Sequence, residues 1–185
     1  MKIKILLFGF VIFAVLFSGC TQPVKNGVTS QNADGSFTYQ NSSYGFKISY
    51  PQDWALRDES NNAFGNFDVS FSSKSGSSEI IGIQVFSSSY SPEELDSTVS
   101  EMSQAITLGG AKIQSTEPFK IANSPAKKVV SSNQGDSRII KSTNIFTIKN
   151  GKLYLIKYVA PEQAYEANKE KTQKIIDSFE FIALN

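Results

Sequence analysis

Residues 145–158 read IFTIKNGKLYLIKY, two apolar runs joined by Asn150-Gly151. Asn-Gly is a preferred dipeptide of the two-residue type I′ turn, because both turn positions need a positive φ. The turn pairs Lys149 with Lys152 and predicts an antiparallel hairpin. Alternation along the two strands gives each face large apolar side chains: Phe146, Ile148, Leu153 and Leu155 on one, and Ile145, Tyr154, Ile156 and Tyr158 on the other.

Both faces of this hairpin need a cover, because an antiparallel sheet with one wet face would alternate between apolar and polar residues. The first cover is a helix that begins at Ser91-Pro92-Glu93-Glu94, where a capping box coincides with proline at the first helical position. Gly109-Gly110 ends this helix. Its apolar stripe consists of Leu95, Val99, Met102 and Ile106.

The second cover is a helix opened by Pro161 near the end of the chain. Its helically spaced residues are Tyr165, Asn168, Thr172, Ile175, Ile176 and Phe179. The predicted fold is therefore α+β, an antiparallel β-sheet sandwiched between helices.

Further strands are predicted along the rest of the chain. Period-two alternation indicates strands over 44–50, 67–72 and 80–86. Weaker patterns, interrupted by Pro118 and Pro125, predict strands over 111–120 and 126–132. The polar stretch 58–66 is expected to be a loop that exposes Phe64.

The first 19 residues resemble an export signal and are excluded from the fold. Their apolar run, Ile5 to Phe17, is too short for an ordinary membrane span, which needs roughly 20 residues. Ser18-Gly19 before Cys20 resembles the lipobox of prokaryotic lipoproteins, although Phe17 stands where that motif usually has leucine. The resemblance implies that Cys20 is lipidated and that the protein is exported and held at the outer face of the cytoplasmic membrane or in the cell envelope. The alternative is an uncleaved signal anchor with a stray cysteine.

Residues 20–36 are rich in Gln, Asn, Gly, Ser and Thr, which predicts a flexible tether. Residues 37–185 fit one domain of ordinary size. Asn41-Ser42-Ser43 at its start also matches the short glycosylation sequon, which is common by chance.

Composition excludes several classes of function. The chain has 18 Lys and Arg against 17 Asp and Glu, and two of the lysines lie in residues 1–19, which leaves 16 basic groups in the mature chain. This balance lacks the positive field of a dedicated nucleic-acid binder. The absence of histidine excludes histidine-dependent triads and the usual zinc sites, and a single cysteine excludes disulfides within one chain. The sequence contains no glycine-rich phosphate-binding loop, so it predicts no nucleotide site.

Two segments carry a family resemblance. Residues 44–54, YGFKISYPQDW, resemble the opening strand and turn of PsbP-like domains, and 175–181, IIDSFEF, resemble their closing helix and strand. The resemblance spans about 140 residues in order. It implies the Mog1/PsbP-like α/β/α sandwich and suggests a small secreted lipoprotein. Photosynthetic members assist the oxygen-evolving centre and its calcium and chloride retention, but a fold does not carry a function with it.

Four carboxylates near the Trp54 turn are the candidate calcium ligands: Asp53, Asp58, Glu59 and Asp68. Calcium needs several converging oxygens, and no EF-hand-type loop is present, so solvated loop acids are the simpler interpretation. Calcium is thus expected only through the family resemblance, no other cofactor is expected, and no metal site is confidently predicted. Trp54 and Tyr50 could stack on a sugar or belong to the core.

Phe64, Lys149 and Lys152 are the candidate interaction surface. Lysines at the hairpin tip could contact anionic headgroups or an acidic partner, or could simply protect a solvated strand.

Two functional hypotheses follow. The first is a non-enzymatic, lipid-anchored accessory or binding module on a membrane or cell-surface complex, with a protein partner. The second is a carboxylate-dependent cell-envelope enzyme such as a carbohydrate-active hydrolase, which needs two acids in one cleft and a raised pKa on one of them.

Overall fold

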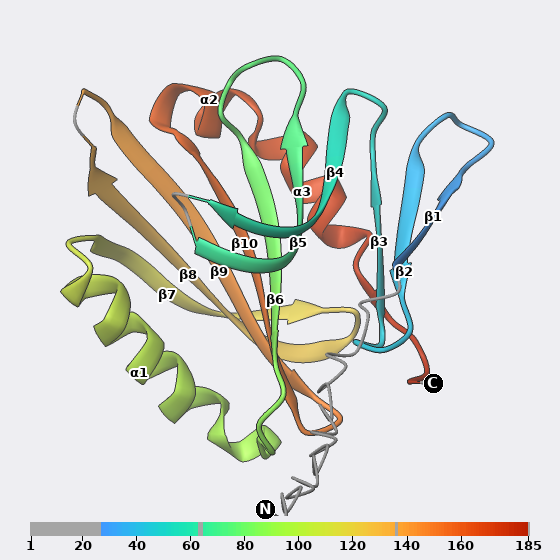
Figure 1. Cartoon of the computed structure of the whole chain (residues 1–185). Helices are drawn as coiled ribbons and strands as arrows, with labels where there is room; N and C mark the ends of the chain where they lie inside the picture. Colours follow the sequence, from blue (N-terminus) through green and yellow to red (C-terminus); the bar gives the residue numbers. More distant parts are fainter. Residues whose placement is uncertain (1–26, 63–64, 136, 185) are drawn as a thin grey trace, which may run out of the picture.

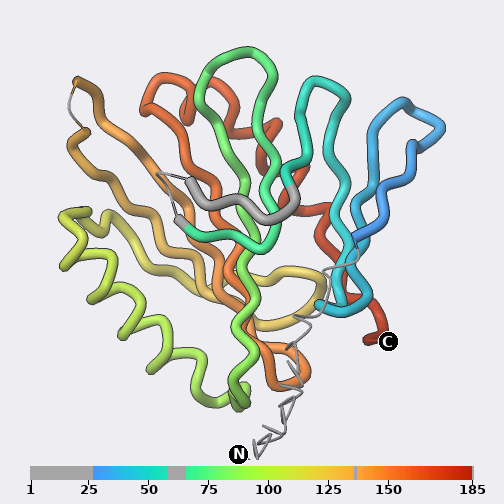
Figure 2. Tube along the Cα trace, viewed as in Figure 1, coloured from blue at the N-terminus to red at the C-terminus, as the bar shows by residue number. Residues whose placement is uncertain are grey.

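The computed structural model describes residues 27–62, 65–135 and 137–184, with the backbone alone for 58–62. In these ranges the chain forms two antiparallel sheets and three α-helices (Figure 1). The larger sheet is strongly curved, as the course of the trace shows (Figure 2). None of the helices in the described ranges has the length and apolar character needed to span a membrane.

The predicted hairpin forms the centre of the larger sheet. Asn150 and Gly151 have φ values of 51° and 72°, and Lys149 pairs with Lys152 as expected. The seven strands run in the order β4 (Trp54–Asn62), β5 (Gly65–Ser73), β6 (Ile80–Phe86), β10 (Lys152–Pro161), β9 (Ile139–Lys149), β8 (Ser124–Gln134) and β7 (Lys112–Ile121).

The smaller sheet corrects the predicted tether. Its strand order is β1 (Gly27–Gln31), β2 (Phe37–Asn41), β3 (Phe46–Tyr50) and β11 (Glu180–Phe181). β1 lies inside the segment 20–36 and pairs with β2 from Gly27 opposite Asn41 to Gln31 opposite Phe37. The described structure therefore begins at Gly27, and the prediction of a tether reaching residue 36 is wrong for 27–31.

The helices begin where the sequence predicts. A 3₁₀ turn, η1 (Pro92–Glu94), leads into α1 (Leu95–Leu108), and the Ser91 N–H donates to Glu94 Oε2 over 2.6 Å in the expected capping box. The helix expected after Pro161 is divided into α2 (Glu162–Ala167) and α3 (Lys169–Asp177). The division falls at Asn168, whose φ of −109° departs from helical geometry.

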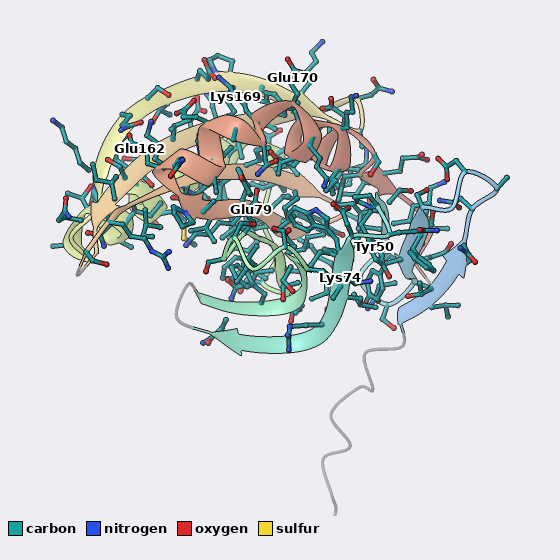
Figure 3. All side chains as sticks on the ribbon, turned by 90° about the horizontal axis from the view of Figure 1, so that it is seen from above. Tyr50, Lys74, Glu79, Glu162, Lys169 and Glu170 are labelled. Carbon is teal, nitrogen blue, oxygen red and sulfur yellow. The ribbon has the colours of Figure 1, made fainter. Side chains whose placement is uncertain are left out.

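Two apolar cores lie on opposite faces of the seven-stranded sheet, as the hairpin predicts. Ile145, Tyr154, Ile156 and Tyr158 share one core with α2, α3 and the smaller sheet. Phe146, Ile148 and Leu153 share the other core with α1. Figure 3 shows Tyr50 and Glu79 among the packed side chains, while Glu162, Lys169 and Glu170 lie along α2 and α3.

The polar stretch 58–66 is not the expected loop. Asp58 pairs with Val69, and β4 and β5 form a hairpin that continues to Asn62 and Gly65. β4 is the edge strand of its sheet, and an edge strand can be polar because it is paired on one side only. Phe64 lies outside the described residues.

A close contact between β5 and β6 gives a stability prediction. A methyl group built on Gly82 would overlap the buried ring of Phe67, whereas one on Gly109 would meet its nearest atom at 3.4 Å. Gly82→Ala should lower the free energy of unfolding by about 1–3 kcal/mol through overpacking. Gly109→Ala should change it by less than ~0.5 kcal/mol. Denaturant titration of the two variants measures both, and equal effects would contradict this packing.

Candidate functional site

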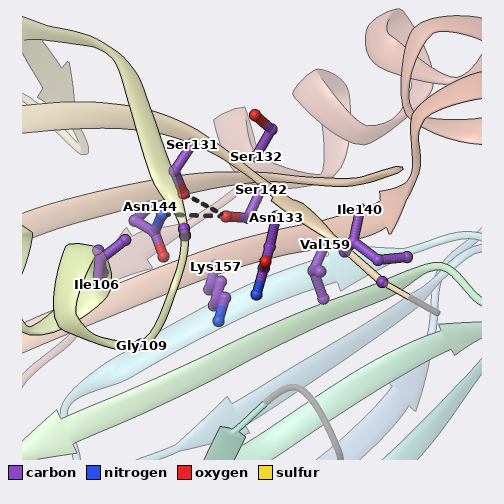
Figure 4. Close-up of a pocket in the computed structure, with 12 residues that line it drawn as sticks. Ile106, Gly109, Ser131, Ser132, Asn133, Ile140, Ser142, Asn144, Lys157 and Val159 are labelled. Atoms are coloured by element: carbon purple, nitrogen blue, oxygen red, sulfur yellow. Dashed lines mark hydrogen bonds between the residues drawn. The ribbon is translucent and has the colours of Figure 1, made fainter. Parts of the chain in front are cut away.

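A groove lies between the end of α1 and the sheet (Figure 4). Its volume is about 340 Å³. We call it the α1 groove and define it by its lining residues: Ile106, Gly109, Ala111, Ser131, Ser132, Asn133, Gly135, Ile140, Ser142, Asn144, Lys157 and Val159. It lies on β8, β9 and β10, beyond the part of the sheet that α1 covers.

The floor of the groove continues the apolar face of the hairpin with polar residues. Ser142 and Asn144 precede Phe146 at a spacing of two, so they project from the same face. Ser142 Oγ and Ser131 Oγ share a hydrogen bond of 2.8 Å, and Asn144 Nδ2 donates to Ser142 Oγ over 3.4 Å (Figure 4). Asn144 Nδ2 also donates to Val129 O over 3.3 Å. These cross-strand contacts hold the polar groups in fixed positions.

Lys157 is the only charged residue among the lining residues. It lies on β10 between Asn144 of β9 and Gly82 of β6, and it is half-buried. Burial lowers its pKa, because removal from water disfavours the ammonium form. The hydroxyl and amide groups of the other lining residues give the groove a capacity for hydrogen bonding.

The rim of the groove is partly apolar. Ile106 near the end of α1 and Ile140 at the start of β9 are half-buried, and Asn133 near the end of β8 is exposed. The exposed residues Leu108 and Ile139 do not line the groove: Leu108 belongs to a shallow hollow on the outer face of α1, and Ile139 alternates with Ile140, so it projects from the other face of the sheet. Apolar side chains beside a polar floor are typical of a surface that binds another molecule.

A second cleft, of about 300 Å³, lies between α2, α3 and β7–β9 and contains two acids, Glu117 and Glu166. Glu117 pairs with Lys128, and Glu166 accepts from Lys141 Nζ over 2.7 Å. The hydrogen bond from Lys141 lowers the pKa of Glu166. A hydrolase needs a general acid with a raised pKa, so Glu166 does not fit that role.

The predicted calcium ligands are separated where the structure describes them. Asp53 pairs with Lys171, while Asp68 accepts from the Val85 N–H over 2.7 Å. The β4–β5 register puts Asp68 opposite position 59, which is six strand positions, or ~20 Å, along from Asp53. Among the described residues no three acids, cysteines or histidines are grouped as for a metal. The side chains of Asp58 and Glu59 lie outside the described part.

Both lysines of the predicted surface contact the protein itself. Lys152 Nζ donates to Ser43 O over 2.9 Å, and Lys149 Nζ lies 5.8 Å from the centre of the Phe181 ring. Cys20 lies outside the described residues, so its lipidation stays a prediction.

Trp54 and Tyr50 belong to the core, with Trp54 only 1% exposed, so they form no sugar platform. Asn41 is fully buried, and its Nδ2 donates to the Tyr39 hydroxyl over 3.1 Å. The sequon is therefore inaccessible in the folded domain.

No motif in the sequence marks the groove, because the polar residues that line it are serines, asparagines and a lysine at no characteristic spacing. One signal was present: alternation places Asn144 and Lys157 on the face that the first helix covers. A 14-residue helix is only ~21 Å long, whereas the 11 residues of β9 span ~37 Å, so part of that face must stay open.

The fold and groove define a class: a small antiparallel α/β/α sandwich with an open cleft on one face. The chain matches the PsbP-like protein family model over residues 3–181 and so belongs to that family. This confirms the resemblance seen in the sequence. No functionally curated protein matches the chain in sequence.

Solved structures share the fold at low sequence identity. Cyanobacterial PsbP (CyanoP) from Synechocystis sp. PCC 6803 is 14% identical, with a TM-score of 0.53 over 90% of this chain and 98% of that one. LpqN, involved in cell envelope biogenesis of Mycobacterium tuberculosis, is 11% identical, with a TM-score of 0.57 over 85% and 91%. A Bacteroides thetaiotaomicron protein is 14% identical, with a TM-score of 0.57 over 78% and 47%.

The lowered pKa of Lys157 gives a pH-dependence. Between this lowered pKa and the ordinary lysine value of 10.5, the unfolded chain binds more protons than the folded one, so stability rises with pH. The free energy of unfolding of the wild type, relative to Lys157→Met, should therefore increase from pH 8 to pH 10. Urea titrations of both proteins at the two pH values measure the difference. A difference that is constant or moves the other way would show that the folded state does not disfavour the ammonium.

Proposed function

We propose that this PsbP-like protein is a non-enzymatic binding module, exported and anchored by lipid on Cys20, that docks a protein partner of a membrane or cell-surface complex. The observation that carries the proposal is the α1 groove, in which a fixed polar floor lies beside the half-buried apolar residues Ile106 and Ile140. Membership of the PsbP-like family supports an accessory role.

The rim suits a protein partner because it resembles the anatomy of a protein interface. Such interfaces place apolar anchors next to a smaller number of hydrogen-bonding groups, and charged residues are depleted at their centre. Ile106 supplies an apolar anchor at one edge and Ile140 supplies one at another. Ser131, Ser142 and Asn144 supply the hydrogen-bonding groups.

The anchor is tested by comparing the wild type with Cys20→Ser in native membranes. Wild type should enter the detergent phase and, after cross-linking, bring down one defined membrane complex. Cys20→Ser should stay in the aqueous phase and recover at least about tenfold less of that complex, because the partner's local concentration falls when the tether is lost. Wild type that also stays aqueous would contradict the anchor. Wild type that enters the detergent phase without a reproducible partner would contradict the binding role.

The groove is tested by a charge placed on its rim. Asn133→Glu introduces a carboxylate at the rim, and because Asn133 is exposed, folding should be unaffected. Recovery of the cross-linked complex should fall about tenfold, which corresponds to ~1.4 kcal/mol. Ser97→Glu, on the exposed first part of α1, is the matched control and should leave recovery unchanged. Equal effects of the two variants would show that the partner binds elsewhere.

A further inference from the structure

The start of β1 lies at one end of the molecule together with three other segments. We call this the anchor end and define it by Gly27–Val28, the β2–β3 turn 42–45, the β9–β10 tip 149–152 and the tail 182–184. Figure 1 shows these segments gathered at the same end, beside the C-terminus. The β1–β2 turn and the β5–β6 loop lie at the opposite end.

Specific contacts hold the anchor end together. Gly27 pairs with Asn41, which directly precedes the β2–β3 turn. Lys152 Nζ and the Tyr154 hydroxyl donate to the Ser43 and Tyr44 carbonyls over 2.9 and 2.7 Å. The Ile182 N–H donates to Gly45 O over 2.9 Å, which fixes the tail against the same turn.

We propose that the anchor end lies against the membrane, in contact with the lipid headgroup region, and that the α1 groove consequently faces away from it. This orientation rests on the lipid anchor of the proposed function. It adds to that function a second interaction surface, whose partner is the bilayer itself.

The length of chain between Cys20 and β1 limits the orientations that the domain can adopt relative to the membrane. Seven residue steps separate Cys20 from Gly27, so they span at most about 25 Å even when fully extended. β9 runs from Lys149 at the anchor end to Ile139 by the groove, and its 11 residues span ~37 Å. An inverted domain would hold Gly27 farther from the membrane than the chain can reach.

Exposed apolar side chains favour an upright domain over one that lies on its side. Four large apolar residues are exposed among those that the structure describes: Val28, Leu108, Ile139 and Leu184. Leu108 ends α1 and Ile139 begins β9, both away from the anchor end. Val28 and Leu184, 68% and 40% exposed, belong to the anchor end. Their contact with the headgroup region would remove this apolar surface from water.

Charge contributes little to this orientation. Lys149 and Lys152 lie at the tip, but the Tyr90 N–H donates to Gly151 O over 3.0 Å, which brings the acidic segment Glu93–Glu94 to the same region. Positive and negative groups are therefore mixed at this end. We expect the orientation to be the same on zwitterionic and anionic vesicles.

The experiment uses the full lipidated chain in phosphatidylcholine vesicles that contain nitroxide-labelled lipid. Cys20 is the only cysteine, and acylation removes its thiol, so an introduced cysteine is the single labelling site. One variant is Ser43→Cys at the anchor end, and the matched control is Ala33→Cys in the β1–β2 turn; both positions are exposed. A fluorophore at 43 should be quenched at least threefold more than one at 33. Replacement of the apolar pair, Val28→Ser with Leu184→Ser, should reduce the quenching at 43.

The outcomes separate the orientation from the anchor. Protein that floats with the vesicles but shows equal quenching at 43 and 33, or more at 33, overturns the orientation and leaves the anchor intact. Protein that fails to float overturns both. Preferential quenching at 43 on both zwitterionic and anionic vesicles supports the proposal as stated. Stronger quenching at 43 than at 33 on anionic vesicles alone would show that charge orients the domain, and would overturn the proposed apolar contact with the bilayer.

Discussion

The pairing of β9 with β10 is the constraint on which the rest of the structure depends. The Asn150-Gly151 turn fixes its register, and the register puts fully buried Ile145 opposite fully buried Ile156 on one face. Phe146 and Leu153 are equally buried on the other face. Because neither face can meet water, the chain must supply two covers, and it does so with α1 on one side and with α2, α3 and the smaller sheet on the other.

The groove is a consequence of how these covers fit. α1 covers the β9–β10 face near the hairpin tip and ends at Leu108, while the strands continue beyond it. Along β9 the side chains on this face are apolar under α1, at Phe146 and Ile148, and polar beyond its end, at Asn144 and Ser142. Open sheet with polar side chains can stay hydrated, so the uncovered area remains a cleft. The anchor and the groove then lie toward opposite ends of the same two strands, which suits a module that is held at one end and binds at the other.

Much of this fold could be predicted from the sequence because its strongest signals are local. The hairpin register, the Ser91–Glu94 capping box and the two apolar faces each depend on neighbouring residues, and each is confirmed. β1 was missed because GVTSQ has no apolar alternation and is ordered by its pairing with β2. The site was missed for a related reason: Ser131, Asn144 and Lys157 come together only through strand pairing and the length of α1. Of the predicted acids, Asp53 and Asp68 lie apart along the β4–β5 pair.

The central claim is that a partner binds at the α1 groove, and site-specific photo-cross-linking in native membranes tests it most directly. A photoreactive phenylalanine analogue at Asn133, on the groove rim, is compared with the same analogue at Ser97, on the exposed first part of α1. The account predicts one discrete adduct from position 133 and none from position 97, in protein that fractionates with membranes. Adducts of the same mass and yield from both positions, or an adduct from 97 alone, would contradict it.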